Sequence, residues 1–119
     1  MLEENEENKS VLIKIGMRTS TRQIINFALT KVRNDWKVTL NAFQMDMTKA
    51  LQAAEIIKTR LPFLHQENKL QSYLATHKVE LKDQPSQERK IIRTGIAITL
   101  SRNYFEAEDQ AGYQKPKPR

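Results

Sequence analysis

Residues 36–43, WKVTLNAF, decide the fold because apolar and polar side chains alternate along them. One side of the segment carries Trp36, Val38, Leu40 and Ala42, and the other side carries Lys37, Thr39 and Asn41. A period of two predicts a β-strand with one buried face.

A helix is predicted on each side of this strand. Upstream, Ser20 or Thr21 can cap a helix over residues 22–33, in which apolar residues recur every three or four positions. Downstream, the same spacing predicts a second helix, which Asp46 or Thr48 can cap and which runs to about Arg60 before Pro62 ends it. A strand between two amphipathic helices favours an α/β fold.

Three more strands complete the pattern. Residues 11–15, VLIKI, are almost continuously apolar, which favours a strand buried on both faces. Residues 71–81 and 91–100 are further strand candidates, and residues 83–86 between them are typical of a turn. The side chains expected to face inward on these two strands are Tyr73, Val79, Leu81, Ile92, Ile96, Ile98 and Leu100.

The resulting order is β-α-β-α-β-β, in which each helix links two strands. Connections of this length place both helices on one face of a four-stranded mixed sheet, which is a two-layer α/β sandwich. We therefore expect one domain over residues 10–102. Residues 1–9 are expected to form a disordered acidic tail, and residues 103–119 an irregular polar tail.

The chain is basic. Its 119 residues contain 20 Lys and Arg against 14 Asp and Glu, a formal net charge of +6, and residues 10–105 alone hold 16 basic and 7 acidic residues. Such a body either binds a polyanion or simply has a soluble basic surface, and the charge alone leaves both interpretations open.

The composition excludes several classes of protein. There is no Cys for a disulfide, a thiolate zinc site or thiol catalysis. The acidic N-terminus is unlike a signal peptide, and no apolar run approaches the roughly 20 residues that span a bilayer. His65 and His77 are not at metal-site spacing from carboxylates, and there is no glycine-rich phosphate loop. We expect no enzymatic activity, metal, cofactor or membrane partner, and a location in the cytoplasm, the nucleus or both.

Two groups of basic residues are candidates for binding a polyanion. Arg18 and Arg22 flank the start of the first predicted helix, where free N–H groups and the helix dipole favour a phosphate. The second group, in the last predicted hairpin, consists of Lys82, Arg89, Lys90 and Arg93. A basic hairpin can lie along a nucleic-acid backbone, although exposed cations also serve solubility alone. Phe43 and Phe63 remain open as base-stacking residues.

Five stretches of the chain, taken in order, are similar to one known family. They are Ile24–Ala28, Val38–Ala42, Met47–Leu51 continued by Ala54–Lys58, Arg60–Gln66 (RLPFLHQ), and Gly112–Pro116 (GYQKP). They resemble the Alba family of small nucleic-acid-binding proteins over residues 10 to about 102, and the last two resemble its protozoan and other eukaryotic members. Their order agrees with the β-α-β-α-β-β pattern.

The resemblance implies an Alba-like dimer, of two identical or two related chains, that binds RNA or DNA in RNA metabolism, translation control or chromatin. The family's lysine pair before the first helix corresponds to Thr21 and Arg22, counted back from Asn26. Lys49 matches the family's helix lysine. The candidate contacts are therefore Arg18, Arg22, Asn26, Lys49, Lys82, Arg89, Lys90 and Arg93.

The sequence also departs from the family. An Arg-Gly-Arg cluster after the second strand is replaced by Phe43, Gln44 and Met45, which favours RNA or a specialised partner over duplex packaging. The apolar replacement also fits contact with protein. The alternative function is a protein subunit of a ribonucleoprotein such as ribonuclease P or the related MRP particle, paired with another Alba-fold chain.

Overall fold

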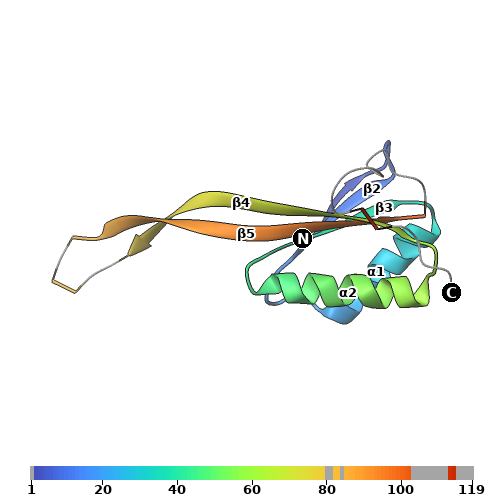
Figure 1. Ribbon diagram of the computed structural model, residues 1–119, viewed down its shortest axis with the longest axis horizontal. Coiled ribbons are helices and arrows are strands. Elements are labelled where there is room, and N and C mark those ends of the chain that lie inside the picture. Colours follow the sequence, from blue (N-terminus) through green and yellow to red (C-terminus); the bar gives the residue numbers. More distant parts are fainter. Residues whose placement is uncertain (1, 80–81, 84, 103–112, 115–119) are drawn as a thin grey trace.

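The computed structural model describes residues 2–79, 82–83, 85–102 and 113–114, which form two helices and one six-stranded sheet (Figure 1). The sheet order is β1-β2-β3-β5-β4-β6; β2 and β3 are parallel, and the other neighbours are antiparallel. In chain order the elements are β1 (Leu2–Asn5), β2 (Ser10–Ile15), α1 (Thr21–Arg33), β3 (Lys37–Phe43), α2 (Asp46–Arg60), β4 (His65–Val79), β5 (Gln87–Ser101) and β6 (Tyr113–Gln114).

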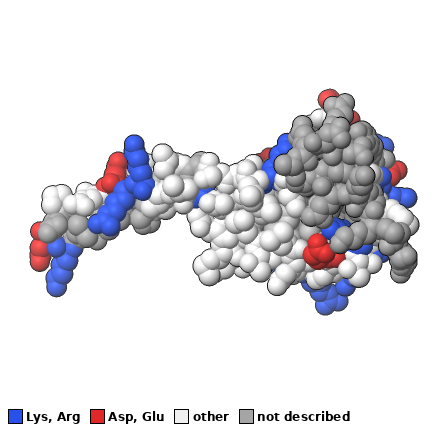
Figure 2. All heavy atoms as spheres, in the orientation of Figure 1, with Lys and Arg blue, Asp and Glu red and all other residues white. Residues whose placement is uncertain are grey.

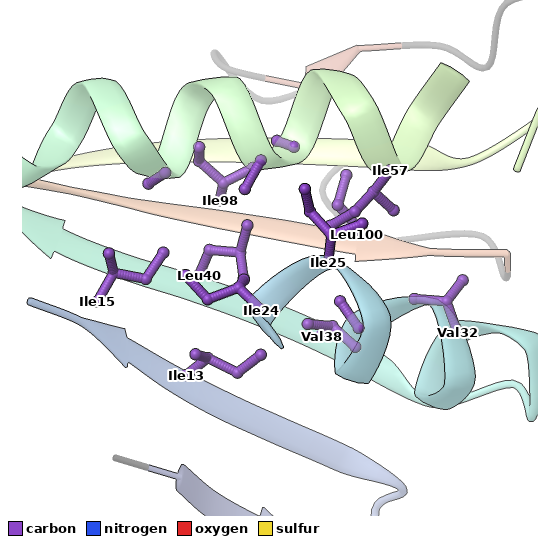
Figure 3. Close-up of a cluster of buried hydrophobic side chains, with 14 of the residues drawn as sticks. Ile13, Ile15, Ile24, Ile25, Val32, Val38, Leu40, Ile57, Ile98 and Leu100 are labelled. Atoms are coloured by element: carbon purple, nitrogen blue, oxygen red, sulfur yellow. The ribbon is translucent and has the colours of Figure 1, made fainter. Parts of the chain in front are cut away.

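The core lies between the two helices and one face of the sheet, which confirms the predicted two-layer architecture (Figures 1 and 3). The alternation in β3 sets this face, because Val38, Leu40 and Ala42 are all buried while Trp36 packs against the core edge. From the other side, α1 and α2 bury the apolar residues that recur at helical spacing, such as Val32 and Ile57.

The burial of β2 differs from the prediction. Val11, Ile13 and Ile15 are buried, but Leu12 is only half-buried and Lys14 is exposed, so the strand buries one face rather than two. Both helices pack on the same side of the sheet, which leaves the other side of β2 without a helix over it. The apolar run in residues 11–15 therefore predicted more burial than β2 has.

The four-strand prediction missed two strands at the edges of the sheet. Within the predicted acidic tail, residues 2–5 form β1, which pairs antiparallel with β2. Its carboxylates bind lysines of the body: Glu3 Oε1 lies 3.2 Å from Lys14 Nζ, and Glu4 Oε1 lies 3.4 Å from Lys31 Nζ. At the other edge β6 pairs with β4, while the rest of the predicted C-terminal tail, 103–112 and 115–119, lies outside the described residues.

The last two large strands form a projecting hairpin. β4 starts at His65, earlier than the predicted residue 71, and its ladder with β5 runs from the pair His65–Ser101 to the pair Val79–Gln87. The far part of this hairpin, residues 70–79 and 87–94, is called the arm here. It extends beyond the helices and gives the molecule a longest dimension of 60 Å against 31 and 29 Å (Figure 1). Ile92, predicted to face inward, is 66% exposed because no helix reaches it.

Candidate nucleic-acid interface

A lysine of α2 organises the loop between β2 and α1. The Gly16 N–H donates to Thr19 Oγ1 over 2.9 Å, and the Thr19 N–H donates back to the Gly16 carbonyl over 3.2 Å. Lys49 Nζ then donates to the carbonyl oxygens of Gly16, Met17 and Thr19 over 3.1, 3.2 and 3.1 Å. An ammonium has three N–H groups, so these acceptors use its full donor capacity. Lys49 is half-buried and positions the loop, a role that its sequence position did not reveal.

The loop held by Lys49 presents Arg18. This arginine is exposed and lines a shallow concavity together with Lys14 and the rest of the loop. Lys14 is partly neutralised by Glu3, whereas the Arg18 guanidinium has no such carboxylate among the described residues. Arg18 is therefore placed as the sequence predicts, at the surface just before α1.

The start of α1 forms a second basic site. Ser20 caps the helix as predicted, with its Oγ accepting from the Gln23 N–H over 3.3 Å, and the first turn contains no acidic residue. Arg22 and Asn26 are one helical turn apart and therefore share a face. They line a concavity of about 500 Å³ together with Arg60, from the last turn of α2. Arg60 was not a predicted site residue, because only the crossing of the two helices brings it to α1.

The ion pairs separate the basic residues into two classes. Among the described residues, carboxylates pair with Lys14, Lys31, Lys58 and Lys69. Within the same part of the chain, none of Arg18, Arg22 and Arg60 forms an ion pair. The loop and the start of α1 therefore carry positive charge that is available to an anion.

The remaining predicted cations lie on the arm. Arg89, Lys90 and Arg93 are exposed on β5, and Lys82 is exposed in the turn at the tip. Figure 2 shows basic side chains along the projecting hairpin, well away from the body. Arg89 and Arg93 share one face of β5 while Lys90 is on the other, since alternate residues of a strand face opposite sides. The arm is thus a separate basic surface from that of Arg18 and Arg22.

An aromatic side chain lies against a glycine where the arm joins the body. Phe43, at the end of β3, is directly opposite Gly95 of β5. A Cβ added to Gly95 would lie 2.3 Å from Phe43 Cδ1 and 2.9 Å from the Ala42 carbonyl oxygen, so the ring rests on the glycine backbone. The Arg93 guanidinium carbon lies over the same ring, 6.0 Å from its centroid.

Replacing Gly95 by Ala is expected to lower the free energy of unfolding by about 1–3 kcal/mol, because the new methyl group overpacks against a ring and a backbone oxygen. Urea unfolding followed by circular dichroism measures the change. Gly16→Ala is the matched control, since its nearest neighbour, Thr19 Oγ1, would be 3.9 Å from the new Cβ. An equal loss of stability in both variants would contradict the packing of Phe43 on Gly95.

The described residues contain no group of three or more His, Cys, Asp or Glu side chains arranged to hold a metal ion. None of their helices has the length and apolar character required to traverse a bilayer.

Comparison with known proteins shows similarity in structure rather than in sequence. No protein-family model matches the chain, and no curated protein matches it significantly. An Alba protein from Thermoplasma volcanium is 22% identical, with 76% of this chain and 99% of that chain covered and a TM-score of 0.49. ALBA1 from Trypanosoma brucei is 11% identical, with 88% of this chain and 76% of that chain covered and a TM-score of 0.52. The second similarity confirms the predicted Alba-like fold.

Proposed function

We propose that this chain is a non-enzymatic protein that binds RNA or DNA, mainly through the sugar–phosphate backbone. The observation that carries the proposal is the set of arginines around α1. Arg18, Arg22 and Arg60 lie at or near a helix start without acidic residues, and no described carboxylate pairs with them. Helix N–H groups and guanidinium groups together bind phosphate oxygens. The Alba-like fold and the sequence motifs support the same function, in the cytoplasm or the nucleus.

We further propose that the binding unit is a dimer, either of this chain or with a second Alba-fold chain. One face of the arm carries the exposed apolar side chains of Leu70, Leu74 and Ile92, at 76%, 65% and 66% exposure. Leu70 pairs with the buried Ile96 and Leu74 pairs with Ile92, so all three lie on the face of the hairpin that the helices cover nearer the body. A second copy of the fold would cover this face and bring two basic surfaces to one nucleic acid.

The test is the salt dependence of nucleic-acid binding. Backbone contacts release counterions, so we expect the affinity for RNA to fall steeply and linearly on a logarithmic plot as salt rises. Arg22→Glu removes one phosphate contact and repels a second phosphate. We therefore expect it to weaken binding about tenfold or more and to lower the slope of log affinity against log salt concentration by more than the loss of one phosphate contact would. Gel-shift or anisotropy titrations with RNA and DNA at several salt concentrations measure both. A flat salt response, or an unchanged affinity in Arg22→Glu, would contradict the proposal.

A second candidate function rests on exposed apolar residues near the same arginines. Met17 is 87% exposed and Met45 is 92% exposed, and they follow the carboxyl ends of the adjacent parallel strands β2 and β3. Exposed methionines beside cations fit a protein partner within a ribonucleoprotein particle, such as a ribonuclease P-like assembly. Purification of the native complex distinguishes the two functions. A defined RNA with constant partner chains supports the particle subunit, and a dimer on many RNAs supports the general binder.

A further inference from the structure

Phe43 and Arg93 form a small stacked pair on the sheet face that the helices leave uncovered. The side chains of Val38, Leu40 and Ala42 face the helices, so Phe43, one residue further along β3, faces the opposite side. Arg93 precedes Gly95 by two residues in β5 and therefore shares that face with it. The pair lies where the basic arm meets the body.

The ring packs closely on the Gly95 backbone. Its Cδ1 and Cε1 atoms would be 2.3 and 2.5 Å from a Cβ at Gly95, so only a glycine leaves room for the ring at this position. The neighbouring backbone is also anchored, because the Gln44 N–H donates to the Thr94 carbonyl over 2.8 Å. The Phe43 side chain is half-exposed, so part of this aromatic surface is open to a ligand.

The guanidinium above the ring is loosely placed. Its carbon lies 6.0 Å from the ring centroid, which is at the outer limit of a cation–π contact. Stacked planes touch at about 3.5 Å, so a planar group between ring and guanidinium requires a separation of about 7 Å. The flexible Arg93 side chain therefore has to move outward to admit a planar group.

We propose that Phe43 and Arg93 hold one unpaired nucleobase, stacked between the phenyl ring and the guanidinium plane. This inference rests on the proposed nucleic-acid binding and specifies its ligand as single-stranded RNA or DNA. A base within a duplex is already stacked on both sides and cannot enter the pair without being extruded. Arg89 lies on the same face of β5, and Arg18 lies in the loop that follows β2, the strand next to β3, so these two arginines are the candidate contacts for the neighbouring phosphates.

The experiment compares three ligands, of which the two single strands carry the same backbone charge. They are an oligouridylate, an abasic strand of equal length, and a blunt RNA duplex. Phe43→Leu keeps an apolar side chain on Gly95 but removes the aromatic face. It is expected to weaken binding to the oligouridylate about tenfold and to leave abasic and duplex binding within about twofold, since stacking contributes roughly that factor per base.

Two further variants test the stacking geometry itself. Arg93→Lys keeps the charge but not the plane, so it should weaken oligouridylate binding several-fold without changing the salt slope. Phe43→Trp should retain the affinity and add a fluorophore that the base quenches, with the single native Trp36 as the baseline. Phe63→Leu makes the same change at the other phenylalanine that the sequence left open for stacking, which is 57% exposed, and we expect this variant to leave oligouridylate binding unchanged.

The outcomes separate this inference from the proposed function. If Phe43→Leu weakens all three ligands equally, or none of them, stacking is wrong although nucleic-acid binding stands. If the wild-type protein binds none of the ligands, both are overturned. Circular dichroism of each variant, compared with the wild type, confirms that the fold is retained.

Discussion

Lys49→Met is expected to lower the free energy of unfolding by about 3 kcal/mol and to weaken nucleic-acid binding at least about tenfold. One ammonium group satisfies three carbonyl oxygens of the loop between β2 and α1, at 3.1, 3.2 and 3.1 Å. Methionine fills a similar volume but donates no hydrogen bond, so the three carbonyls lose their common partner. Hydrogen bonds from charged donors stabilise the fold more than bonds from neutral donors do. Because Lys49 is partly exposed, the total stabilisation from its three bonds is smaller than it would be for a buried lysine.

The loss of affinity in this variant follows from the loop. Arg18 depends on the loop conformation that Lys49 holds, and α1 starts directly after it. Urea unfolding without nucleic acid and binding titrations in parallel separate the two effects. Gln52→Met, an exposed position on the same helix, is the control for introducing methionine. Equal stability of the two variants would mean that Lys49 does not hold the loop. Any loss of affinity in Lys49→Met would then come from a direct contact of Lys49 with nucleic acid.

If the chain forms the proposed dimer through the arm, Leu74→Asp combined with Ile92→Asp is expected to convert it into a monomer and to weaken binding about a hundredfold or more. The two side chains are opposite each other on the arm and are 65% and 66% exposed. An aspartate pair within an apolar contact has to be desolvated and is repelled by its own copies, which disfavours association. In a dimer, binding by one basic surface raises the effective concentration of the second at the same nucleic acid. A monomer has only one such surface and loses this gain in affinity.

Sedimentation velocity of the free protein measures the oligomeric state, and anisotropy titration measures the affinity. Asn8→Asp with Gln52→Asp adds the same two charges at exposed positions outside both the arm and the concavity of Arg22, and so controls for the change in net charge. A wild-type protein that is already monomeric, or an aspartate variant that remains dimeric, would show that the arm is not the dimer contact.

The elements that bury a periodic apolar face were predictable from the sequence. The alternation in residues 36–43 and the spacing in α1 and α2 gave their positions to within three residues, because burial against the core selects that pattern. β1 and the start of β4 were missed for the same reason. Their segments, LEEN and HQENKL, are mostly polar, and they are strands because a neighbouring strand offers unpaired backbone groups.

The candidate site was predictable only where one segment carries it. Arg22 followed from a capped helix start, which is a local signal. The clamp of Lys49 on Gly16 joins residues 33 positions apart, and the contact of Phe43 with Gly95 joins two strands that are not consecutive. Such pairs depend on the order of strands in the sheet and on how the helices cross. The spacing of apolar residues along the sequence does not predict either of these. Arg60 belongs to the same class, because it reaches α1 through the packing of α2.

The short acidic strand β1 has a consequence for the solubility of the chain. Without it, the backbone of β2 would present the sequence VLIKI along an open sheet edge, and apolar edges of this kind recruit strands from other molecules into aggregates. β1 occupies that edge with four exposed residues, two of which are glutamates anchored on Lys14 and Lys31. Charged side chains on the outermost strand discourage further pairing there. We therefore expect the N-terminal segment to limit aggregation through the edge of the sheet.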